Sequence, residues 1–237
     1  LKKVEDKMGI RCVPVVEVLF KDCKVPVENL LGGKEGFGFK HAMMTLDCAR
    51  PGVAAQAVGL AQGALDLALY YTFHRKQFGT TLSNMQYIQF RLAELAAKIE
   101  SARQLVYAAA RALDRGAEDV SRLSAMSKLV ATEVAMEVTT YAVQAFGGYG
   151  YMKDYPIEKF MRDAKITQIY EGTNEVQRLV IAKSLYKDVR NLDFLSKVIP
   201  TEKQFISTEA GVDNPEYYSV PGDAEADVGK LKELDLP

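Results

Sequence analysis

The sequence predicts a mainly α-helical fold, an antiparallel helical bundle preceded by a few short β-strands. Three observations lead to this prediction. Apolar residues recur at helical spacing over stretches much longer than a strand, the loops between these stretches are short, and glycines stand where several of them end. Nothing repeats at a fixed period, which argues against a solenoid. Long helices joined by short loops pack as a bundle, because each buries an apolar stripe against its neighbours.

Residues 1–31 are the part of the chain that we expect to form short strands. Val13, Val15 and Phe20 are β-branched or aromatic residues in an alternating pattern, and residues 22–24 form a turn signal. Two or three short strands do not make a stable sheet alone. We therefore interpret residues 1–31 as the remnant of a β-domain whose other part is absent from this sequence.

Residues 32–187 are expected to form the helical bundle. Pro51 removes a backbone donor from the first helix, so it is expected to bend that helix or to begin its main segment. Three glycines, Gly52, Gly59 and Gly63, are expected to allow close contacts with neighbouring helices. The helices are expected at about residues 39–73, 84–115, 119–146, 157–164 and 173–186.

Residues 188–237 are expected to form an extended or partly disordered tail. The apolar periodicity fades there, and prolines at 200, 215 and 221 stand near an acidic mixture at 222–227.

The composition excludes several classes of function. The net charge is −1 and neither sign forms a block, so a nucleic-acid partner is not expected. The three cysteines have no metal-ligand spacing and indicate a reducing compartment. With two histidines, a zinc site or a histidine-dependent triad is not expected, and we predict no metal. No apolar run approaches the length of a membrane span and no targeting segment is visible, so no membrane partner is expected.

The stretch 168–178 carries the most informative pattern. A short extended segment is expected to lead to a turn at Gly172, and Thr173 is a good N-cap for the helix that follows. Glu171 therefore stands just before a helix N-terminus, whose free amides suit an anion. On spacing alone, a glutamate before such a turn is more often a solvated residue than a catalytic one, and both interpretations remain open.

Three other groups have a structural and a functional interpretation. Asp47 and Arg50 lie on one face of a helix and form either a surface ion pair or a binding pair. Arg75 is either a solvated loop charge or a guanidinium that grips a pyrophosphate. The pair Gly147 and Gly148 is either a helix stop or a place where the backbone approaches a ligand closely.

Taken together, these motifs resemble the C-terminal half of acyl-CoA dehydrogenases, flavoproteins that desaturate acyl-CoA thioesters between the α and β carbons. The resemblance extends from about Met8 to Tyr186 and covers about half of a complete family member. Its most specific motif is Ile-Tyr-Glu-Gly-Thr at residues 169–173. The other matching segments are residues 25–31, 47–50, 75–79, 144–150 and 161–165.

The resemblance implies roles at the substrate. Glu171 matches the catalytic base, which takes the pro-R α-proton while the β-hydride passes to flavin N5. A minority of the family carries its base on the earlier helix, at the position of Ala49, and alanine cannot serve. Asp47 and Arg50 match residues that contact the adenine and ribose end of CoA, and Gly172 matches a residue that lies against the acyl-CoA.

The resemblance also implies FAD as cofactor. Arg75, Gln77 and Phe78 match residues that reach the FAD of a neighbouring subunit, and Gln86 belongs to the same surface. The segment 144–148 is expected to contribute from the partner side. The implied FAD contacts are Arg75, Gln77, Phe78, Gln86, Gln144, Ala145, Phe146, Gly147, Gly148, Thr173, Asn174 and Glu175.

The implied partners are a short- or medium-chain acyl-CoA, an electron-transferring flavoprotein as electron acceptor, and further copies of the chain in a homodimer or a dimer of dimers. The implied compartment is the cytoplasm in a bacterium or the mitochondrial matrix in a eukaryote. The sequence departs from the family pattern in lacking the N-terminal helical domain and most of the β-domain, and in the tail after about Asp188. Two alternatives stay open: an acyl-CoA oxidase-like enzyme, and a non-catalytic helical assembly module of the same fold.

Overall fold

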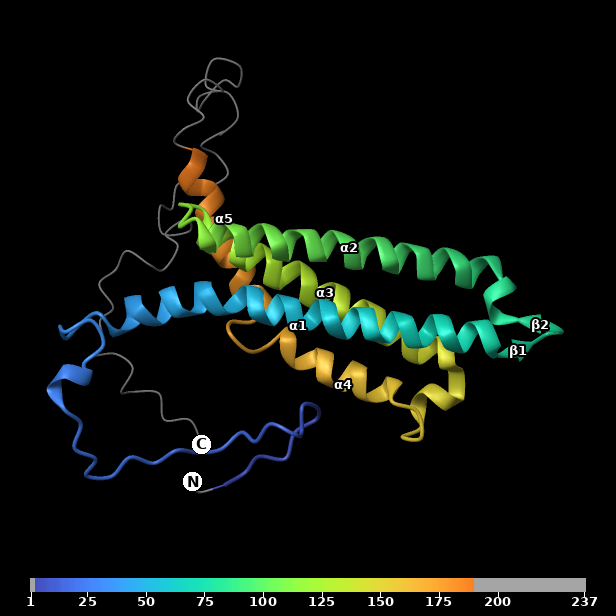
Figure 1. Cartoon of the computed structure of the whole chain (residues 1–237), viewed down its shortest axis with the longest axis horizontal. Coiled ribbons are helices and arrows are strands. Elements are labelled where there is room, and N and C mark those ends of the chain that lie inside the picture. Colours follow the sequence, from blue (N-terminus) through green and yellow to red (C-terminus); the bar gives the residue numbers. More distant parts are fainter. Residues whose placement is uncertain (1–2, 190–237) are drawn as a thin grey trace, which may run out of the picture. The chain divides into compact units, whose positions relative to one another are not determined.

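The computed structural model describes residues 3–189 and confirms the mainly α-helical bundle (Figure 1). Helices α1, α2 and α3 lie side by side, and α4 packs against α1 and α3. The predicted helix bounds agree with the observed ones to within three residues. The tail predicted for residues 188–237 lies almost entirely outside the described residues. The helices are α1 (Gly38–His74), α2 (Gln86–Asp114), α3 (Val120–Phe146), α4 (Ile157–Thr167) and α5 (Asn174–Val189).

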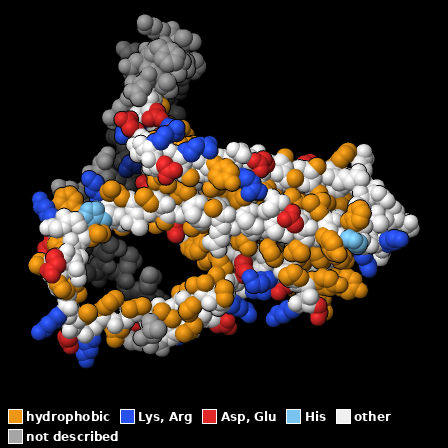
Figure 2. All heavy atoms as spheres, viewed as in Figure 1, with side chains coloured by type: hydrophobic (Ala, Val, Ile, Leu, Met, Phe, Trp, Pro, Cys, Tyr) orange, Lys and Arg blue, Asp and Glu red, His pale blue; other side chains and the backbone are white. Residues whose placement is uncertain are grey.

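The strands expected within residues 1–31 are not formed in the part of this segment that the structure describes. A single β-bridge joins Val4 to Val16, and a short 3-10 helix spans Val27–Asn29. Phe20 is 77% exposed, and Figure 2 shows hydrophobic side chains open to solvent along this segment. A strand needs a neighbour to satisfy its backbone donors and acceptors, and this segment has none beyond the bridge. The expectation of strands here was therefore wrong, although the residue types suit them.

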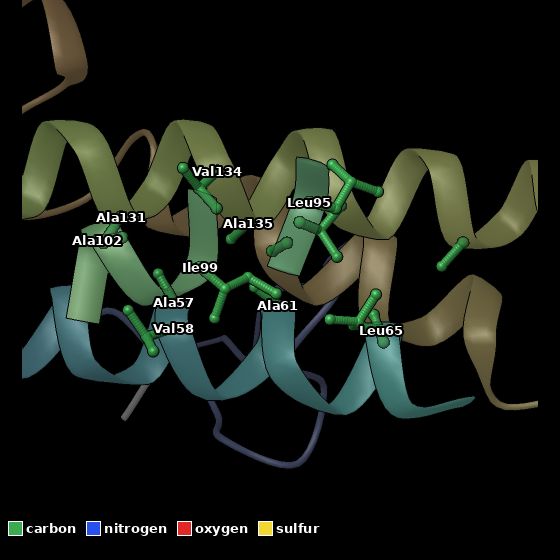
Figure 3. Packing of buried hydrophobic residues seen from close by; sticks show 14 of the residues in the cluster. Ala57, Val58, Ala61, Leu65, Leu95, Ile99, Ala102, Ala131, Val134 and Ala135 are labelled. Atoms are coloured by element: carbon green, nitrogen blue, oxygen red, sulfur yellow. The ribbon is translucent and has the colours of Figure 1, made fainter. Parts of the chain in front are cut away.

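The contact between α1 and α3 is built mainly from alanine. We call it the alanine seam, and Figure 3 shows how its side chains meet at the centre of the bundle. Leu95 and Ile99 of α2 fill the space beside it. Because the side chain at each of these positions is a methyl group, the two backbones can approach closely there without leaving a void. The seam consists of Ala54, Ala57, Ala61, Ala64, Ala131 and Ala135, all fully buried.

Gly63 is the glycine of α1 at which close packing requires a missing side chain. A Cβ atom there would lie 2.8 Å from the ring of Phe160 in α4. Gly52 and Gly59 are exposed, and a Cβ atom on either would meet nothing within 4 Å. The expected role in close helix contacts was therefore wrong for these two. Helix α1 also continues through Pro51, so its main segment does not begin there.

Helix α1 contains a stretch that is long and apolar enough to cross a membrane by length and composition alone. This differs from the sequence analysis, because alanine, glycine and leucine together raise the hydropathy without forming an unbroken apolar run. The same helix supplies four of the six alanines of the seam, and a core helix of a bundle passes the same test. The stretch is therefore weak evidence for a membrane span.

Candidate active site

The segment between α4 and α5 forms a tight turn, so the extended conformation expected just before Gly172 was wrong. We call residues 168–173 the catalytic turn, after the role that the family resemblance implies for Glu171. Helix α4 ends at Thr167, and the backbone N–H of Asn174 donates to the carbonyl of Gln168 across the turn at 3.0 Å. The hydroxyl of Thr173 accepts from the backbone N–H of Val176 at 3.4 Å, as expected of an N-cap. The residues that follow the turn are therefore set at a helix N-terminus.

Glu171 has an unusual backbone and an unpaired side chain. Its φ is +54° and that of Gly172 is +90°, so two consecutive residues adopt the left-handed conformation. One carboxylate oxygen of Glu171, Oε2, is buried and has no hydrogen-bond partner among the described residues. A buried unpaired carboxylate oxygen is costly, and such groups concentrate at functional sites. This oxygen therefore has an unused capacity to accept a hydrogen bond or a proton.

Gly172 is held by the side chain of Gln177, which lies one turn into α5. The Nε2 group of Gln177 donates to the carbonyl of Gly172 at 2.9 Å and to that of Glu171 at 3.3 Å. A Cβ atom on Gly172 would lie 2.8 Å from that Nε2 and 3.8 Å from Nη2 of Arg50. A side chain at Gly172 would therefore disturb the turn itself.

Arg50 is buried beside the catalytic turn, at 3% exposure. Its Nη1 donates to Oδ1 of Asp47 at 2.6 Å, and Ser121 of α3 donates to the same oxygen at 3.2 Å. The Nε of Arg50 is buried and has no partner within residues 3–189. The pair is thus no ordinary surface ion pair, and the structure brings Asp47, Arg50 and Gly172, the predicted substrate residues, together at one place.

Lys128 of α3 is a residue of this site that the sequence analysis missed. Its side chain is fully buried, and its Nζ donates to the carbonyl of Gly172 at 3.0 Å and to Oδ1 of Asn174 at 2.9 Å. Burial, followed by the positive charge of Arg50, lowers the pKa of Lys128 to about 8, while Glu175 and Glu171 act in the opposite direction. A lysine on the small-residue face of a helix was the signal that could have revealed it.

Tyr170 ties the catalytic turn to α1. Its hydroxyl donates to Oε1 of Gln56 at 2.6 Å. Burial raises the pKa of Tyr170, the negative charge of Glu171 raises it further, and the hydrogen bond to Gln56 opposes both. The turn is therefore anchored on α1, α3 and α5 at once.

A β-hairpin missed by the sequence analysis follows α1. Strand β1 (Lys76–Gln77) pairs with β2 (Thr80–Thr81), and the two residues between them, Phe78 and Gly79, have φ values of +54° and +80°. Two left-handed residues in a row match the twist of a two-residue hairpin. Phe78 is 91% exposed at the hairpin tip. An aromatic residue with a strained backbone therefore points away from the rest of the chain.

A cavity of about 830 Å³ lies between this hairpin and the end of α3, and we call it the hairpin cavity. The guanidinium of Arg75 lies 5.4 Å from the centre of the Tyr149 ring, and Tyr71 stacks on Phe146 with ring centres 4.0 Å apart. A Cβ atom on Gly147 or Gly148 would meet nothing within 4 Å, so their backbone is open to a ligand. The predicted FAD residues that line the cavity are Arg75, Gln77, Phe78, Gln144, Ala145, Phe146, Gly147 and Gly148.

The other predicted FAD residues lie elsewhere. Gln86 is exposed at the first position of α2 and does not line the hairpin cavity. Thr173, Asn174 and Glu175 lie at the start of α5. Asn174 is 4% exposed, its Oδ1 accepts from Lys128 and from Thr132, and its buried Nδ2 has no partner in the described part of the chain.

The catalytic turn and the hairpin cavity lie at distant places along α1. Arg50 contacts the turn and Arg75 lines the cavity, and 25 residues of continuous helix separate them, about 37 Å at 1.5 Å per residue. A dinucleotide is shorter than this distance. The predicted substrate residues and the FAD residues of the hairpin cavity therefore lie at two separate places on one chain.

The chemical groups of the hairpin cavity fit one end of a dinucleotide cofactor such as FAD. A guanidinium suits a pyrophosphate, aromatic rings suit a flat ring system, and the open glycine backbone lets a ligand approach closely. Within residues 3–189, no group of three or more histidine, cysteine, aspartate or glutamate side chains is placed to hold a metal ion. The two histidines, His41 and His74, lie at opposite ends of α1.

Comparisons with known proteins agree with this geometry. Residues 36–186 match the family model described as acyl-CoA dehydrogenase, C-terminal domain. The probable acyl-CoA dehydrogenase fadE25 of Mycobacterium leprae is 55% identical over 183 residues, which are 77% of this chain and 47% of that protein. The structure of butyryl-CoA dehydrogenase from Megasphaera elsdenii matches with a TM-score of 0.76 at 55% identity, over 78% of this chain and 48% of that one.

A further solved structure, described as the electron transferring flavoprotein of Acidaminococcus fermentans, contains a chain that matches with a TM-score of 0.76 at 56% identity. The match covers 78% of this chain and 48% of that one. The present chain thus spans about half the length of the relatives that it matches.

Proposed function

This chain belongs to the acyl-CoA dehydrogenase family, and we propose that it is the C-terminal helical part of an enzyme that desaturates a short- or medium-chain acyl-CoA between its α and β carbons. The observation that carries the proposal is the buried, unpaired carboxylate oxygen of Glu171 in a left-handed turn at a helix N-terminus. The match to butyryl-CoA dehydrogenase supports a short acyl chain.

In this mechanism Glu171 is the general base. Its unpaired Oε2 takes the α-proton of the thioester, while Gln177 and Lys128 hold the carbonyls of the turn. Gly172 leaves room for the substrate, and the buried guanidinium of Arg50 supplies positive charge nearby. Bound FAD would accept the β-hydride, which completes the double bond.

We propose that each FAD lies between two copies of the chain. The hairpin cavity of one copy would hold one end of the cofactor. The start of α5 in the other copy, with Thr173 and Glu175, would hold the other end beside the catalytic turn of that second copy. Three findings support this arrangement: the separation of the catalytic turn and the hairpin cavity along α1, the open backbone at Gly147 and Gly148, and the outward position of Phe78. This predicts a homodimer or a dimer of dimers.

We further propose an electron-transferring flavoprotein as the electron acceptor. The support is the similarity of this chain to a chain in the structure described as an electron transferring flavoprotein. The competing acceptor is oxygen, as in an acyl-CoA oxidase. If the rate of oxygen consumption equals the rate of substrate use, oxygen is the acceptor and the proposal of an electron-transferring flavoprotein is wrong.

The experiment that tests the function is the visible absorption spectrum of the intact protein, as its gene encodes it, with FAD and then with butyryl-CoA. We expect a flavin band that bleaches on addition of the thioester. A protein that stays colourless after incubation with FAD would instead support the non-catalytic helical module.

The role of Glu171 is tested with Glu171→Gln in the same assay. The variant should bind FAD and butyryl-CoA, and the rate of bleaching should fall by at least about 10²-fold, because an amide cannot take the proton. Glu94→Gln is the matched control, since Glu94 is an exposed carboxylate on α2. Bleaching by Glu171→Gln at the rate of this control would show that another group is the base.

A further inference from the structure

Lys128 is an unusual residue to find in the middle of a helical bundle. Its side chain is fully buried between small neighbours of its own helix, such as Ser124 and Ala131. No acidic side chain in the described part of the chain forms an ion pair with it, and its two partners are the carbonyl of Gly172 and Oδ1 of Asn174. A buried ammonium group without a carboxylate is costly, so its position calls for an explanation.

The two partners of Lys128 flank the turn that carries Glu171. Gly172 follows Glu171 directly, and Asn174 is the first residue of α5. Glu171 is not a glycine, yet it holds a φ of +54°, which persists only where surrounding contacts fix it. Gln177 binds the same carbonyl of Gly172 from α5, so Lys128 supplies the contact from α3.

We propose that Lys128 is a positioning residue for the base: its ammonium group fixes the Gly172 carbonyl and the start of α5, and so holds the turn in the conformation that presents the Glu171 carboxylate to substrate. This inference rests on the proposed function of Glu171.

Arg50 from α1, Glu171 in the turn and Glu175 at the start of α5 are the charged groups that act on Lys128. The two glutamates favour its protonated form, which is the form that donates to the Gly172 carbonyl and to Asn174.

The test uses Lys128→Met in the intact protein with FAD. Methionine is close to lysine in length and apolar, and it leaves the Gly172 carbonyl without its α3 partner. We expect kcat for butyryl-CoA to fall by about 10²-fold with little change in KM, because misplacement of a reacting group acts on the chemical step.

The matched control is Thr139→Val. Thr139 lies on the same helix and is fully buried, but its hydroxyl donates only to carbonyls of its own helix, those of Ala135 and Met136. We expect kcat and KM of this variant to stay close to those of the wild type. If Lys128→Met behaves like Thr139→Val, the inference is wrong.

A double variant decides whether Lys128 acts through Glu171. In single-turnover flavin bleaching, Lys128→Met should cost little further rate once Glu171→Gln is present, because the group being positioned is already gone. If the rate losses of the two single variants multiply in the double variant, the inference is wrong. If wild-type protein shows no bleaching at all, the proposed function has failed instead, and the two failures are thereby distinguished.

Hydrogen exchange gives a readout that is independent of turnover. Backbone amides in residues 168–177 should exchange faster in Lys128→Met than in Thr139→Val, with the rest of the bundle unchanged. Should Lys128→Met fail to fold, Asn174→Ala removes one of the two acceptors of the ammonium group and should give the same loss of kcat and the same faster exchange. If Lys128→Met folds and the amides of residues 168–177 exchange as slowly as in the wild type, the inference is wrong.

Discussion

Lys128 links the pH of the solution to the stability of the fold. Burial, followed by the charge of Arg50, lowers the pKa of Lys128 from 10.5 to about 8 in the folded protein. Between these two pH values the unfolded chain binds a proton that the folded protein has released, so the free energy of unfolding rises with pH. Below pH 8 the cost of burying the charge is fully present.

Urea denaturation of the wild type and of Lys128→Met measures this effect. The difference in free energy of unfolding, wild type minus variant, should increase from pH 8 to pH 10.5. A difference that stays constant or decreases over this range would mean that the lysine titrates normally in the folded protein.

Gly172 is a residue at which a single methyl group should be harmful. Gly172→Ala forces an alanine to a φ of +90° and places its Cβ 2.8 Å from Nε2 of Gln177. We expect a loss of about 1–3 kcal/mol in the free energy of unfolding, measured by urea denaturation. Gly52→Ala is the control, because Gly52 is exposed within a helix and the added methyl meets nothing; it should be neutral or stabilising by up to about 1 kcal/mol. Equal effects of the two substitutions would contradict the geometry of the turn.

At the scale of elements, a larger residue in the alanine seam should destabilise the fold more than the same residue on the exposed side of α1. Ala61→Val adds two methyl groups where α1 meets α3, and overpacking of this kind costs about 1–3 kcal/mol. Ala55→Val on the exposed side of the same helix should cost about 0.5 kcal/mol, the difference in helix propensity. Thermal unfolding of both variants checks this, and equal melting temperatures would show that the seam has spare room.

The helices could be predicted from the sequence because their apolar spacing is long and regular. The buried face of α3 was harder to predict, since large residues such as Leu123 and Leu129 lie at its border, whereas Ser124, Ser127 and Lys128 are fully buried. Size and hydrophobicity therefore indicated the border of the buried face rather than its centre. For this reason the sequence analysis missed the role of Lys128.

The hairpin after α1 could not be predicted because each strand has only two residues. Its turn holds a phenylalanine, Phe78, in the left-handed conformation, where propensity favours asparagine, aspartate or glycine. The strands expected near Val13 and Phe20 fail for the opposite reason: the residue types are right, but among residues 3–189 no neighbouring strand pairs with them beyond one β-bridge. The turn at Gly172 and the start of the next helix were predicted correctly because Gly172 and Thr173 carry local signals.

At the scale of the whole molecule, a cofactor site shared between two copies has a distinctive consequence. Arg75→Ala damages the hairpin cavity and Glu171→Gln removes the base, so each variant alone should be inactive. In a mixed dimer, one of the two sites receives an intact Arg75 from one chain and an intact Glu171 from the other. An equal mixture, co-expressed, should therefore recover up to about a quarter of the wild-type activity.

The control for this experiment is a mixture of Arg75→Ala with Gln144→Ala. Both substitutions fall in the hairpin cavity, so no mixed dimer gains an undamaged site. Recovery in this control, or none in the first mixture, would rule out a site divided in this way.

The alanine seam also constrains how the bundle folds. It joins α1 to α3, which are separated along the chain by the whole of α2. Closing such a long loop costs entropy before the seam can form, whereas the contact of α1 with α2 is local in sequence. We therefore expect the contact between helices α1 and α2 to form early in folding and the alanine seam to form late. On that view, substitutions in the seam would mainly accelerate unfolding and leave the folding rate almost unchanged.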